Sequence, residues 1–400
     1  MRPSAVTERR IRILFAIPAL DKGGPDRVFF ELLRALDRAR FSPVLVTSEP
    51  TGHYLSRLPG DVELHHLGRE VGVATRYPVL PLARVVRRLR PAVVLATLRM
   101  GLTAGLGRPL FPRATRLIVR PANHLSQNHG ELIRGAPLKH RISYALSRLA
   151  LTRADHLICQ GEDLAVDLAR LGIATPMTVI GNPIDVDDVA RLAATPATLP
   201  GSPALLAVGR LSRQKGFDLL VAAFVRLLAT APAAHLTIAG TGPDEAALRE
   251  LTRTLGIADR VTLRGFVENP YPLMRAADLY VLSSRYEGFP NVALEALACG
   301  TPVVAAACPG VAELILPGVN GWLAPVDDVA GLADALALAT RTRAQLTAGA
   351  IRDSVRTRFE TGRIARRYEQ VIAELARSCP PPPALHGVVA LAGSDGGPTV

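Results

Sequence analysis

The sequence is poor in aromatic side chains, in cysteine and in long apolar runs. Phe, Trp and Tyr make up only 4% of its 400 residues, which fits an α/β protein better than a β-sandwich. The four cysteines are scattered and form no C-x-x-C pair, so we expect reduced thiols in a cytoplasmic protein. Nowhere do about 18 apolar residues follow one another, so no transmembrane helix is expected. The short apolar run after the basic start predicts a buried strand and no signal peptide.

Acidic side chains are also in deficit. There are 35 Asp and Glu against 47 Lys and Arg, which gives a net charge of +12. This excess favours an anionic partner, such as nucleic acid, an anionic bilayer or a phosphorylated substrate. The alternative is that the arginines serve solubility alone. Hydrophobic residues make up 48% of the chain, which is ample for buried cores and argues against disorder.

Short apolar runs alternate with longer amphipathic segments along the whole chain. In the first half, runs typical of buried strands lie at 12–20, 43–49, 93–98, 116–121 and 156–161, with helical patterns near 25–37, 78–90 and 137–153. In the second half, strand patterns lie at 204–211, 236–242, 261–266, 279–284 and 301–306, with helical patterns near 215–229, 243–255 and 269–276. Strands that alternate with helices form parallel sheets, so the two series predict an α/β protein with two Rossmann-like domains.

The boundary between the two series is placed in "IGNPIDVDD", which is rich in Gly, Pro, Asn and Asp. The first domain is expected over 1–181 and the second over 182–378. A long helical tract at 327–377 ends the second domain, and its last helix could pack back on the first. Residues 379–400 have the Pro- and Gly-rich composition of a flexible tail.

Two glutamates eight positions apart flank a glycine turn in "SRYEGFPNVALEALACG", residues 284–300. A predicted strand ends just before Glu287, and Glu295 lies inside the helix that follows. Asn291 is expected to be the N-cap of that helix and Gly300 to end it. Parallel sheets place ligands beyond the carboxyl ends of their strands, where a helix N-terminus favours an anion. Two carboxylates there suit a polyhydroxyl ligand, and the alternative is two unrelated surface residues.

A second motif, "VGRLSRQKGFDLL", places two cations beside a predicted helix. Arg210 follows the end of a strand, and Lys215 opens the helix. Together they form a place for a diphosphate, although either one alone could be an ordinary surface residue. Near the start, Gly23 and Gly24 separate the first strand from the first helix, as in a glycine turn that approaches a ligand. The pattern is not G-x-G-x-x-G, so alone it is a weak signal.

Together these segments resemble the GT-B glycosyltransferases, and specifically the retaining glycosyltransferase family 4. The resemblance covers residues 11–377, and its most specific part is "SSRYEGFPNVALEALACGTPVVA". The segments "VGRLSRQKGFDLL", "IAGTGPDEAALRE", "VTLRGFVENP" and "GVNGWLAPVDD" fall in the family's usual order. The resemblance implies a GT-B fold, in which two Rossmann-like domains face each other across a cleft, and the transfer of a sugar from a nucleotide-sugar donor.

The resemblance also implies roles for residues on the donor side. Arg210 and Lys215 would hold the donor diphosphate, and Glu295 the ribose hydroxyls. Glu287 would lie near the transferred sugar. The remaining donor-binding residues implied are Gly23 and Gly24 beside the phosphates, the backbone of Gly288, Phe289, Pro290 and Asn291 beside the sugar hydroxyls, and Arg264, Gly265, Phe266 and Val267 beside the base.

On the acceptor side the sequence departs from the family. Many members carry a histidine after the strand equivalent to 116–120, whereas this chain reads "VRPANHLSQNHGE". His124 lies near that place but is offset, and Asn123 or Ala122 is the alternative match. Arg120, Asn123 and His124 are therefore acceptor-side candidates. The candidate catalytic residues are Glu287, Arg210, Lys215, Asn123 and His124.

No metal or other cofactor is expected. A nucleotide sugar loses its diphosphate through an oxocarbenium-like state, and Arg210, Lys215 and the helix N-terminus could stabilise charge on the leaving group. Asp185 and Asp187 have the D-x-D spacing of metal sites in other glycosyltransferases, but they fall in the interdomain linker. A metal held by these two carboxylates is the alternative.

Basic residues concentrate in the first domain. They are not interleaved with aromatic side chains and carry no nucleic-acid motif, so nucleic-acid binding is not expected. An anionic membrane surface with a lipid-linked acceptor is the more coherent partner. These residues are Arg84, Arg87, Arg88, Arg90, Arg108, Arg113, Arg116, Arg134, Lys139 and Arg141.

The expected function is a retaining transfer of a hexosyl or N-acetylhexosaminyl group from a nucleotide sugar, with UDP as the expected nucleotide. The acceptor is expected to be a lipid-linked or polysaccharide precursor, used at the inner face of the membrane in cell-envelope or exopolysaccharide synthesis. The alternatives are a nucleotide-sugar epimerase of the same fold and a catalytically silent nucleotide-sugar-binding protein. Loss of Glu287, Arg210 or Lys215 would favour the silent protein, and this chain has all three.

Overall fold

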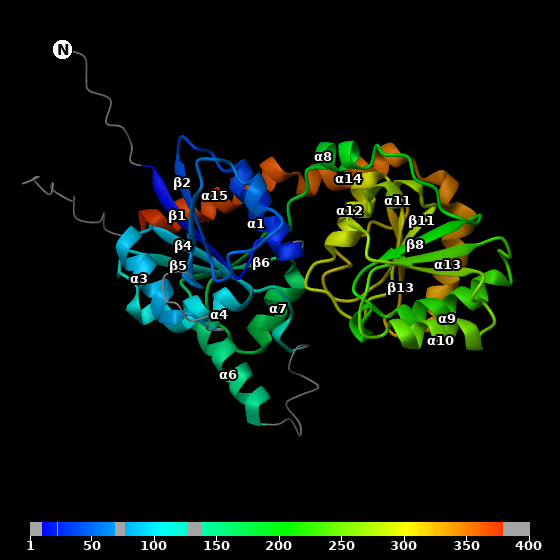
Figure 1. Cartoon of the computed structure of the whole chain (residues 1–400), viewed down its shortest axis with the longest axis horizontal. Coiled ribbons are helices and arrows are strands. Elements are labelled where there is room, and N and C mark those ends of the chain that lie inside the picture. Colours follow the sequence, from blue (N-terminus) through cyan, green and yellow to red (C-terminus); the bar gives the residue numbers. More distant parts are fainter. Residues whose placement is uncertain (1–9, 22, 69–76, 127–137, 379–400) are drawn as a thin grey trace, which may run out of the picture.

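The computed structural model describes residues 10–21, 23–68, 77–126 and 138–378. Within them the chain forms two α/β domains that lie side by side along its longest axis (Figure 1). Each domain is built on one parallel sheet whose faces are covered by helices. The predicted fold class of two Rossmann-like domains is confirmed.

The N-terminal domain has a seven-stranded sheet in the order β3-β2-β1-β4-β5-β6-β7. Its strands are β1 (Ile11–Ile17), β2 (Phe41–Thr47), β3 (Glu63–His66), β4 (Val93–Thr97), β5 (Arg116–Arg120), β6 (His156–Cys159) and β7 (Met177–Val179). Its helices are α1 (Gly24–Ala35), α3 (Val79–Leu89), α4 (Leu98–Gly107), α6 (Leu138–Thr152) and α7 (Glu162–Arg170), with short 3-10 turns η1 (Leu55–Arg57) and η2 (Arg108–Leu110).

The C-terminal domain has a six-stranded sheet in the order β10-β9-β8-β11-β12-β13. Its strands are β8 (Ala204–Val208), β9 (His235–Ala239), β10 (Val261–Gly265), β11 (Leu279–Leu282), β12 (Val303–Ala306) and β13 (Gly321–Ala324). Its helices are α8 (Val186–Leu192), α9 (Phe217–Leu228), α10 (Glu245–Thr254), α11 (Tyr271–Ala276), α12 (Asn291–Cys299), α13 (Val329–Thr342) and α14 (Ala348–Phe359), with 3-10 turns η3 (Arg213–Lys215) and η4 (Arg343–Gln345). The last helix, α15 (Thr361–Arg377), follows α14 in the chain.

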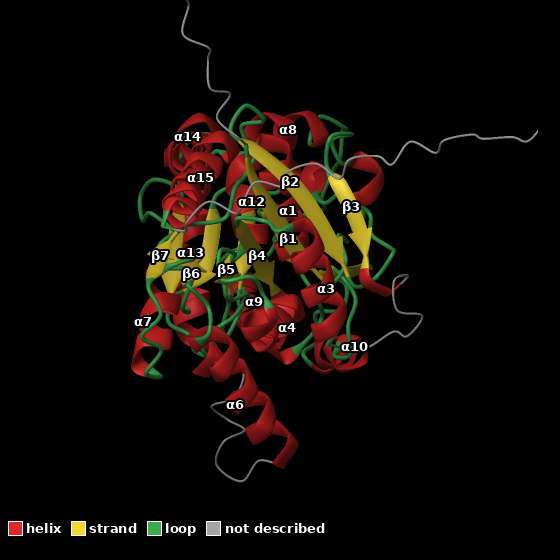
Figure 2. Ribbon diagram, turned by 90° about the vertical axis from the view of Figure 1, so that its left-hand side faces the viewer, coloured by secondary structure: helices red, strands yellow, loops and turns green. Residues whose placement is uncertain are grey.

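The strands read as continuous apolar runs because both faces of each sheet are covered. In β1, Ile13 and Phe15 pack under α1 and α15, whereas Leu14 and Ala16 pack against the opposite layer, which includes α3, α4 and α7. Figure 2 looks onto the N-terminal domain and shows its sheet between these layers. Alternate residues of a strand point to opposite faces, so a strand with two covered faces has no polar side.

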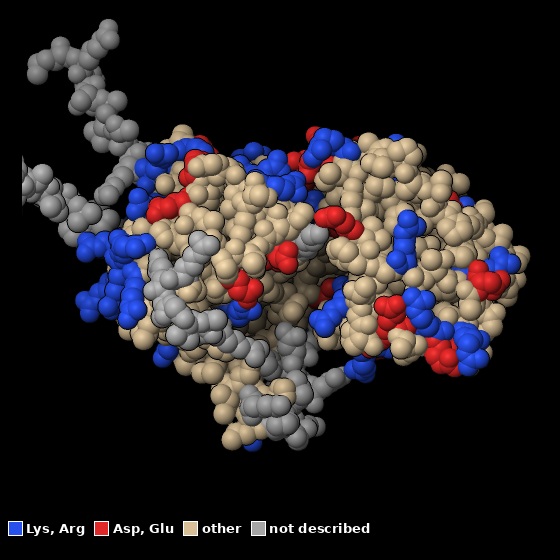
Figure 3. Space-filling view, in the orientation of Figure 1, with Lys and Arg blue, Asp and Glu red and all other residues tan. Residues whose placement is uncertain are grey.

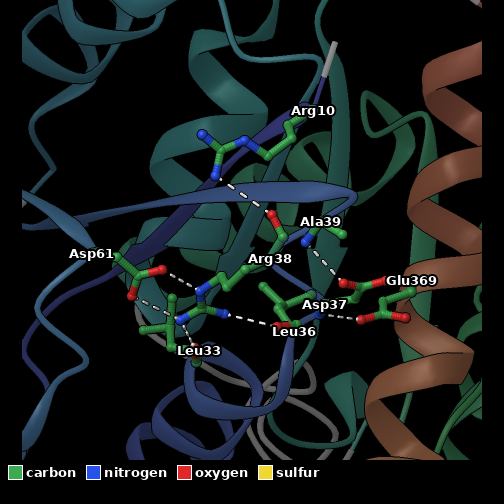
Figure 4. Close-up of polar contacts among 8 residues, drawn as sticks. All are labelled: Arg10, Leu33, Leu36, Asp37, Arg38, Ala39, Asp61 and Glu369. Atoms are coloured by element: carbon green, nitrogen blue, oxygen red, sulfur yellow. Dashed lines mark hydrogen bonds and ion pairs between the residues drawn. The ribbon is translucent and has the colours of Figure 1, made fainter. Parts of the chain in front are cut away.

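The last helix crosses back to the N-terminal domain. Tyr368 and Ile372 of α15 are buried in the same core as the first strands. The backbone N–H of Asp37 donates to Glu369 of α15 (2.8 Å), and the neighbouring Arg38 pairs with Asp61 (2.5 Å), as Figure 4 shows. The chain therefore passes between the domains twice, once before α8 and once before α15.

Several short elements were not predicted from the sequence. β3, β7 and β13 have four, three and four residues, too few for a clear alternation pattern. α4 contains three glycines, which lower its helix propensity, and α7 and α8 are short. The predicted tract at 327–377 contains α13, α14 and α15. The predicted tail at 379–400 lies outside the described residues.

No helix in the described ranges is long and apolar enough to cross a membrane. Cys159, Cys299 and Cys308 are free and buried, and burial raises the pKa of each thiol to about 12. These three side chains are therefore neutral thiols near pH 7, unsuited to act as nucleophiles. Cys379 lies outside the described residues.

Candidate active site

The loops that follow the central strands of the two sheets meet at the interface between the domains. The molecular surface is hollowed there, and charged side chains stand around the hollow (Figure 3). A small pocket at this interface is lined by residues of both domains, including Gly24, Arg27, Asn291 and Glu295. Most of the residues singled out in the sequence surround this region.

Glu287 and Lys215 form the charged centre of the C-terminal side. Lys215 Nζ lies 2.7 Å from Glu287 Oε1, and the buried hydroxyl of Ser284 donates to the same oxygen (2.6 Å). Glu287 is only 7% exposed, so its carboxylate is held by both donors in a largely dry site. Lys215 is placed by its own carbonyl, which accepts a bond from Ser283 Oγ (2.9 Å) at the end of β11. Lys215 and Glu287, 72 positions apart in the sequence, thus form one ion pair.

The other cations predicted for the donor lie at the surface. Arg210 is exposed, and no described residue forms an ion pair or a hydrogen bond with its guanidinium. Arg264 is exposed at the end of the edge strand β10, and Phe266 beyond it is 62% exposed. The intervening Gly265 adopts a positive φ of 77°. Arg210 is therefore free to bind an anion. Arg264 and Phe266 of the expected base-flanking segment are exposed to solvent, whereas Val267 packs against the domain core.

Glu295 contacts the opposite domain. Its Oε1 lies 2.7 Å from Arg27 Nη1 of α1, and Arg27 also donates to the hydroxyl of Tyr271. The Arg27 and Glu295 side chains are 13% and 14% exposed. Burial acts to lower the pKa of Arg27, but the carboxylate of Glu295 outweighs it and the net shift is upward. The carboxylate expected to bind ribose is therefore tied to the N-terminal domain by a partly buried ion pair.

The glycine turn between the two glutamates touches both loops of the N-terminal domain. A Cβ added to Gly288 would lie 2.1 Å from the carbonyl oxygen of Ala122 and 3.0 Å from Asn123 Oδ1. No side chain fits at Gly288 without moving the backbone after β5, so glycine is required there. At the other end of the turn, Asn291 lies against Gly24. The turn is held between the loop after β1 and the loop after β5.

The start of α12 differs from the prediction in one respect. The helix begins at Asn291, and Pro290 is the N-cap without a side-chain bond, so the prediction that Asn291 caps the helix was wrong. Asn291 instead accepts a bond from Asn182 in the linker (2.7 Å), which occupies its side chain. The predicted helix end is correct, since Gly300 is the C-cap with φ of 87°.

The turn offers fewer backbone donors than its length suggests. Pro290 has no N–H, and the N–H of Asn291 donates to the carbonyl of Phe289 (3.0 Å). In the described part of the chain, the N–H groups of Gly288 and Phe289 have no acceptor. The Phe289 ring packs against Phe359, with centroids 5.7 Å apart, and so belongs to the protein interior. Gly288 and Phe289 are the backbone positions best placed to bind a sugar hydroxyl.

The two candidates on the acceptor side occupy different environments. Asn123 is exposed and faces the turn at Gly288. His124 is 3% exposed, and neither ring nitrogen has a hydrogen-bond partner among the described residues. A buried polar group without a partner costs about 1–3 kcal/mol, so the ring nitrogens of His124 are expected to have a partner that is not among the described residues. Residues 127–131 of the same predicted segment lie outside the described residues.

Arg120 is a buried structural residue. It is 1% exposed, and its guanidinium donates to Tyr368 of α15 (3.2 Å) and to Asn182 of the linker. Asn182 in turn donates to Asn291. This chain of bonds joins β5, α15, the linker before α8 and the start of α12. The role of Arg120 as an acceptor-side residue, one of the candidates from the sequence, is not favoured by this position.

The D-x-D carboxylates have other partners. Asp185 caps α8 by accepting from the N–H of Asp188 (2.8 Å). Asp187 pairs with Arg356 (2.7 Å), and its hydrogen bond from Arg356 lowers the pKa of Asp187. Among the described residues no group of three or more His, Cys, Asp or Glu side chains is placed to hold a metal ion.

Sequence reasoning missed Arg27, Tyr271 and Asn182, which join the domains at this site. Arg27 carried a usable signal, because it follows the Gly23-Gly24 turn within the first turn of a helix. Tyr271 and Asn182 carried none, since their roles depend on how the two domains are placed.

The fold and both halves of the sequence match known glycosyltransferases. Residues 22–188 match the family described as Glycosyltransferase Family 4, and residues 202–340 match the family described as Glycosyl transferases group 1. The solved structure of HepE from Anabaena in complex with UDP-glucose has a TM-score of 0.71 to this chain. The two are 20% identical, and the match covers 91% of this chain and 100% of HepE. The fold is therefore that of the GT-B glycosyltransferases.

Named relatives agree with this class. The 2-deoxystreptamine N-acetyl-D-glucosaminyltransferase of Streptomyces fradiae is 31% identical over 304 residues, which are 72% of this chain and 70% of that protein. The lipopolysaccharide core biosynthesis glycosyltransferase LpsE of Rhizobium meliloti is 31% identical over 192 residues, which are 48% of this chain and only 55% of that protein. The chain belongs to the glycosyltransferase family and has its GT-B fold.

Proposed function

We propose that the chain is a retaining glycosyltransferase of family 4. It transfers a hexosyl or N-acetylhexosaminyl group from a UDP-sugar to a lipid-linked or polysaccharide-precursor acceptor. The proposed setting is cell-envelope or exopolysaccharide synthesis at the cytoplasmic face of the membrane. The relative LpsE supports this setting because its name places it in lipopolysaccharide core synthesis. HepE supports a UDP-sugar donor because it was solved with UDP-glucose.

One observation carries the proposal. Lys215 and Glu287, 72 residues apart in sequence, meet at 2.7 Å beside the start of α12, within reach of loops from both domains. A cation and a carboxylate at one point suit a donor that carries both a diphosphate and sugar hydroxyls. Arg210 adds a second cation that no described residue neutralises.

The proposed chemistry assigns each group a task. Arg210, Lys215 and the N-terminus of α12 stabilise the negative charge that develops on the departing diphosphate. Glu295 accepts from ribose hydroxyls, while Glu287 and the N–H groups of Gly288 and Phe289 bind hydroxyls of the transferred sugar. The bond from C1 of the sugar to the phosphate oxygen breaks, and a bond from C1 to the acceptor oxygen forms on the same face. The acceptor proton passes to the departing phosphate oxygen, so no strong protein base is needed.

Metal independence is part of the proposal. The positive charges of Arg210 and Lys215 supply the neutralisation that a divalent ion provides in other enzymes. Turnover should therefore persist in excess EDTA. Complete loss in EDTA that magnesium or manganese restores would contradict this part and would direct attention to Asp185 and Asp187.

A panel of nucleotide sugars tests the whole proposal. The purified chain is incubated with each donor, and release of the nucleotide diphosphate is measured with and without acceptor extracts. Release from a UDP-sugar is expected, with the anomeric configuration kept in the product. Interconversion of the sugar without nucleotide release would indicate an epimerase, and binding without either reaction would indicate a silent protein.

A further inference from the structure

Helix α6 extends away from the body of the N-terminal domain, at the bottom of Figure 1, and Figure 2 shows the same projection from another side. Its C-terminal half is anchored against α4. Ala150 and Leu151 are buried, and a Cβ added to Gly105 of α4 would lie 2.5 Å from Ala150. The helix is therefore a fixed part of the domain, while one side of it is exposed.

An apolar stripe runs along the exposed side of α6. Its members are 69%, 50%, 36% and 39% exposed in chain order, and they are Leu138, Ile142, Leu146 and Leu149. Steps of four, four and three residues keep side chains on one face of a helix. Four large aliphatic side chains in one row are unlike the single exposed apolar residues found on any protein surface. The row indicates a face that another apolar phase covers.

Positive charge borders this stripe. Arg141 and Arg148 are exposed on one side of the stripe, each immediately before a stripe residue, and Arg153 is exposed just after the end of the helix. No Asp or Glu occurs between Leu138 and Ala154. No described residue forms an ion pair with these three arginines. An apolar row bordered by cations, on a helix without acidic residues, is the arrangement of helices that lie in the plane of a lipid interface.

We propose that α6 docks the protein on an anionic lipid bilayer, with the apolar stripe among the acyl chains and the flanking arginines at the headgroups. Charge complementarity selects this occupant, because a second copy of the chain would bring the same arginines into mutual repulsion. A helix of this length spans about 22 Å, enough to lie along the surface without crossing it. The proposal extends the proposed lipid-linked acceptor, but vesicle binding itself does not depend on transfer.

Cosedimentation with vesicles tests the docking. The full chain is mixed with vesicles of phosphatidylcholine alone or of an equimolar mixture with phosphatidylglycerol. Binding is expected only to the anionic vesicles and should weaken as salt rises. The double variant Ile142→Gln/Leu146→Gln should lower partitioning at least tenfold, because it removes two side chains from the apolar phase. Arg141→Gln/Arg148→Gln should also lower it at least tenfold, at roughly fivefold for each charge.

Matched control variants distinguish binding through the α6 stripe from nonspecific binding of the chain to vesicles. Leu338→Gln removes a 43% exposed leucine from α13 of the other domain, and Arg226→Gln/Arg341→Gln removes two exposed charges there. Both controls should bind as the unaltered chain does. Equal loss in the controls, unchanged binding of the α6 variants, or equal binding to neutral vesicles would overturn the proposal. So would a dimer in sedimentation velocity that Ile142→Gln dissociates.

The donor chemistry is measured in the same variants. Release of UDP from the donor should be unchanged in Ile142→Gln/Leu146→Gln, because α6 contributes no residue to the donor site. Loss of vesicle binding with intact UDP release supports docking by α6. Vesicle binding without UDP release from any donor would leave docking standing and count against the proposed function alone.

Discussion

The two domains bring different kinds of groups to the site between them. The C-terminal domain brings charged side chains on loops after β8 and β11, and Lys215 and Glu287 are paired within that domain. The N-terminal domain brings backbone and neutral groups, at Gly24, Ala122 and Asn123, together with one cation, Arg27. The difference fits the proposed ligands: a diphosphate needs fixed charge, whereas a hydroxyl acceptor needs only a hydrogen bond.

We call the C-terminal side of the site the charged half and the N-terminal side the neutral half. The largest effect is expected at Glu287, in the centre of the charged half. Glu287→Gln keeps the shape of the side chain but removes the charge that is proposed to lie beside the reacting sugar. We expect turnover to fall about 10²–10³-fold, or roughly 2.7–4 kcal/mol, which is typical for one electrostatic group in an active site. Steady-state kinetics with the preferred donor should show the loss in kcat, with a small change in KM.

A control for this variant is Ser284→Ala, which removes the other donor to Glu287 and keeps the charge. Its loss of turnover should be smaller, near the value of one hydrogen bond, about 0.5–1.5 kcal/mol. If Glu287→Gln turns over as fast as the unaltered chain, the charged half does not carry the chemistry.

The second comparison lies within the charged half, between the partly buried Lys215 and the exposed Arg210. Lys215→Ala and Arg210→Ala should each weaken UDP binding by about 1.5–3 kcal/mol, because each removes a charge-assisted contact. Only Lys215→Ala should also lower the free energy of unfolding, by roughly 1–3 kcal/mol, since it leaves the buried Glu287 without its counter-ion. Isothermal titration with UDP and chemical denaturation measure the two effects. Equal stability of the two variants would show that the ion pair contributes nothing to folding.

The same difference explains what could be predicted from the sequence. The charged half follows short motifs: Lys215 and Glu287 each stand just after a buried strand, and parallel sheets bring such positions to one edge. The alternation of strands and helices predicted both parallel sheets, because it too is a pattern within short stretches of sequence. The join between the domains could not be predicted, because Arg120 to Asn182 and Arg27 to Glu295 depend on how two separate sheets are placed. Arg120 looked like a site residue at a strand end, yet its partners on the linker and α15 make it structural.

A smaller effect tests the one ion pair that joins the two halves. Arg27→Gln and Glu295→Gln should each raise the donor KM roughly tenfold, since the ion pair holds in place the carboxylate proposed to bind ribose. The double variant should be little worse than either single variant, with a coupling of about 1–2 kcal/mol for a direct contact. Simple addition of the two losses would show that the residues act independently. A lower KM in Arg27→Gln would show that Arg27 competes with the ribose.

The smallest effects are expected in the neutral half, where Asn123 and His124 compete for the role of the family's histidine. Asn123 is exposed and its oxygen faces the turn at Gly288, so Asn123→Ala should lower turnover severalfold by removing a hydrogen bond of about 0.5–1.5 kcal/mol.

His124 is buried and its ring nitrogens have no partner among the described residues. If His124 is only a core residue, His124→Phe replaces an unsatisfied polar ring by an apolar one of similar shape. This substitution should raise the free energy of unfolding by about 1 kcal/mol and leave turnover nearly unchanged. Kinetics and denaturation on both variants decide the matter. A folded, inactive His124→Phe beside an active Asn123→Ala would show that a substrate reaches the buried ring, and that the neutral half depends on a specific side chain as much as the charged half does.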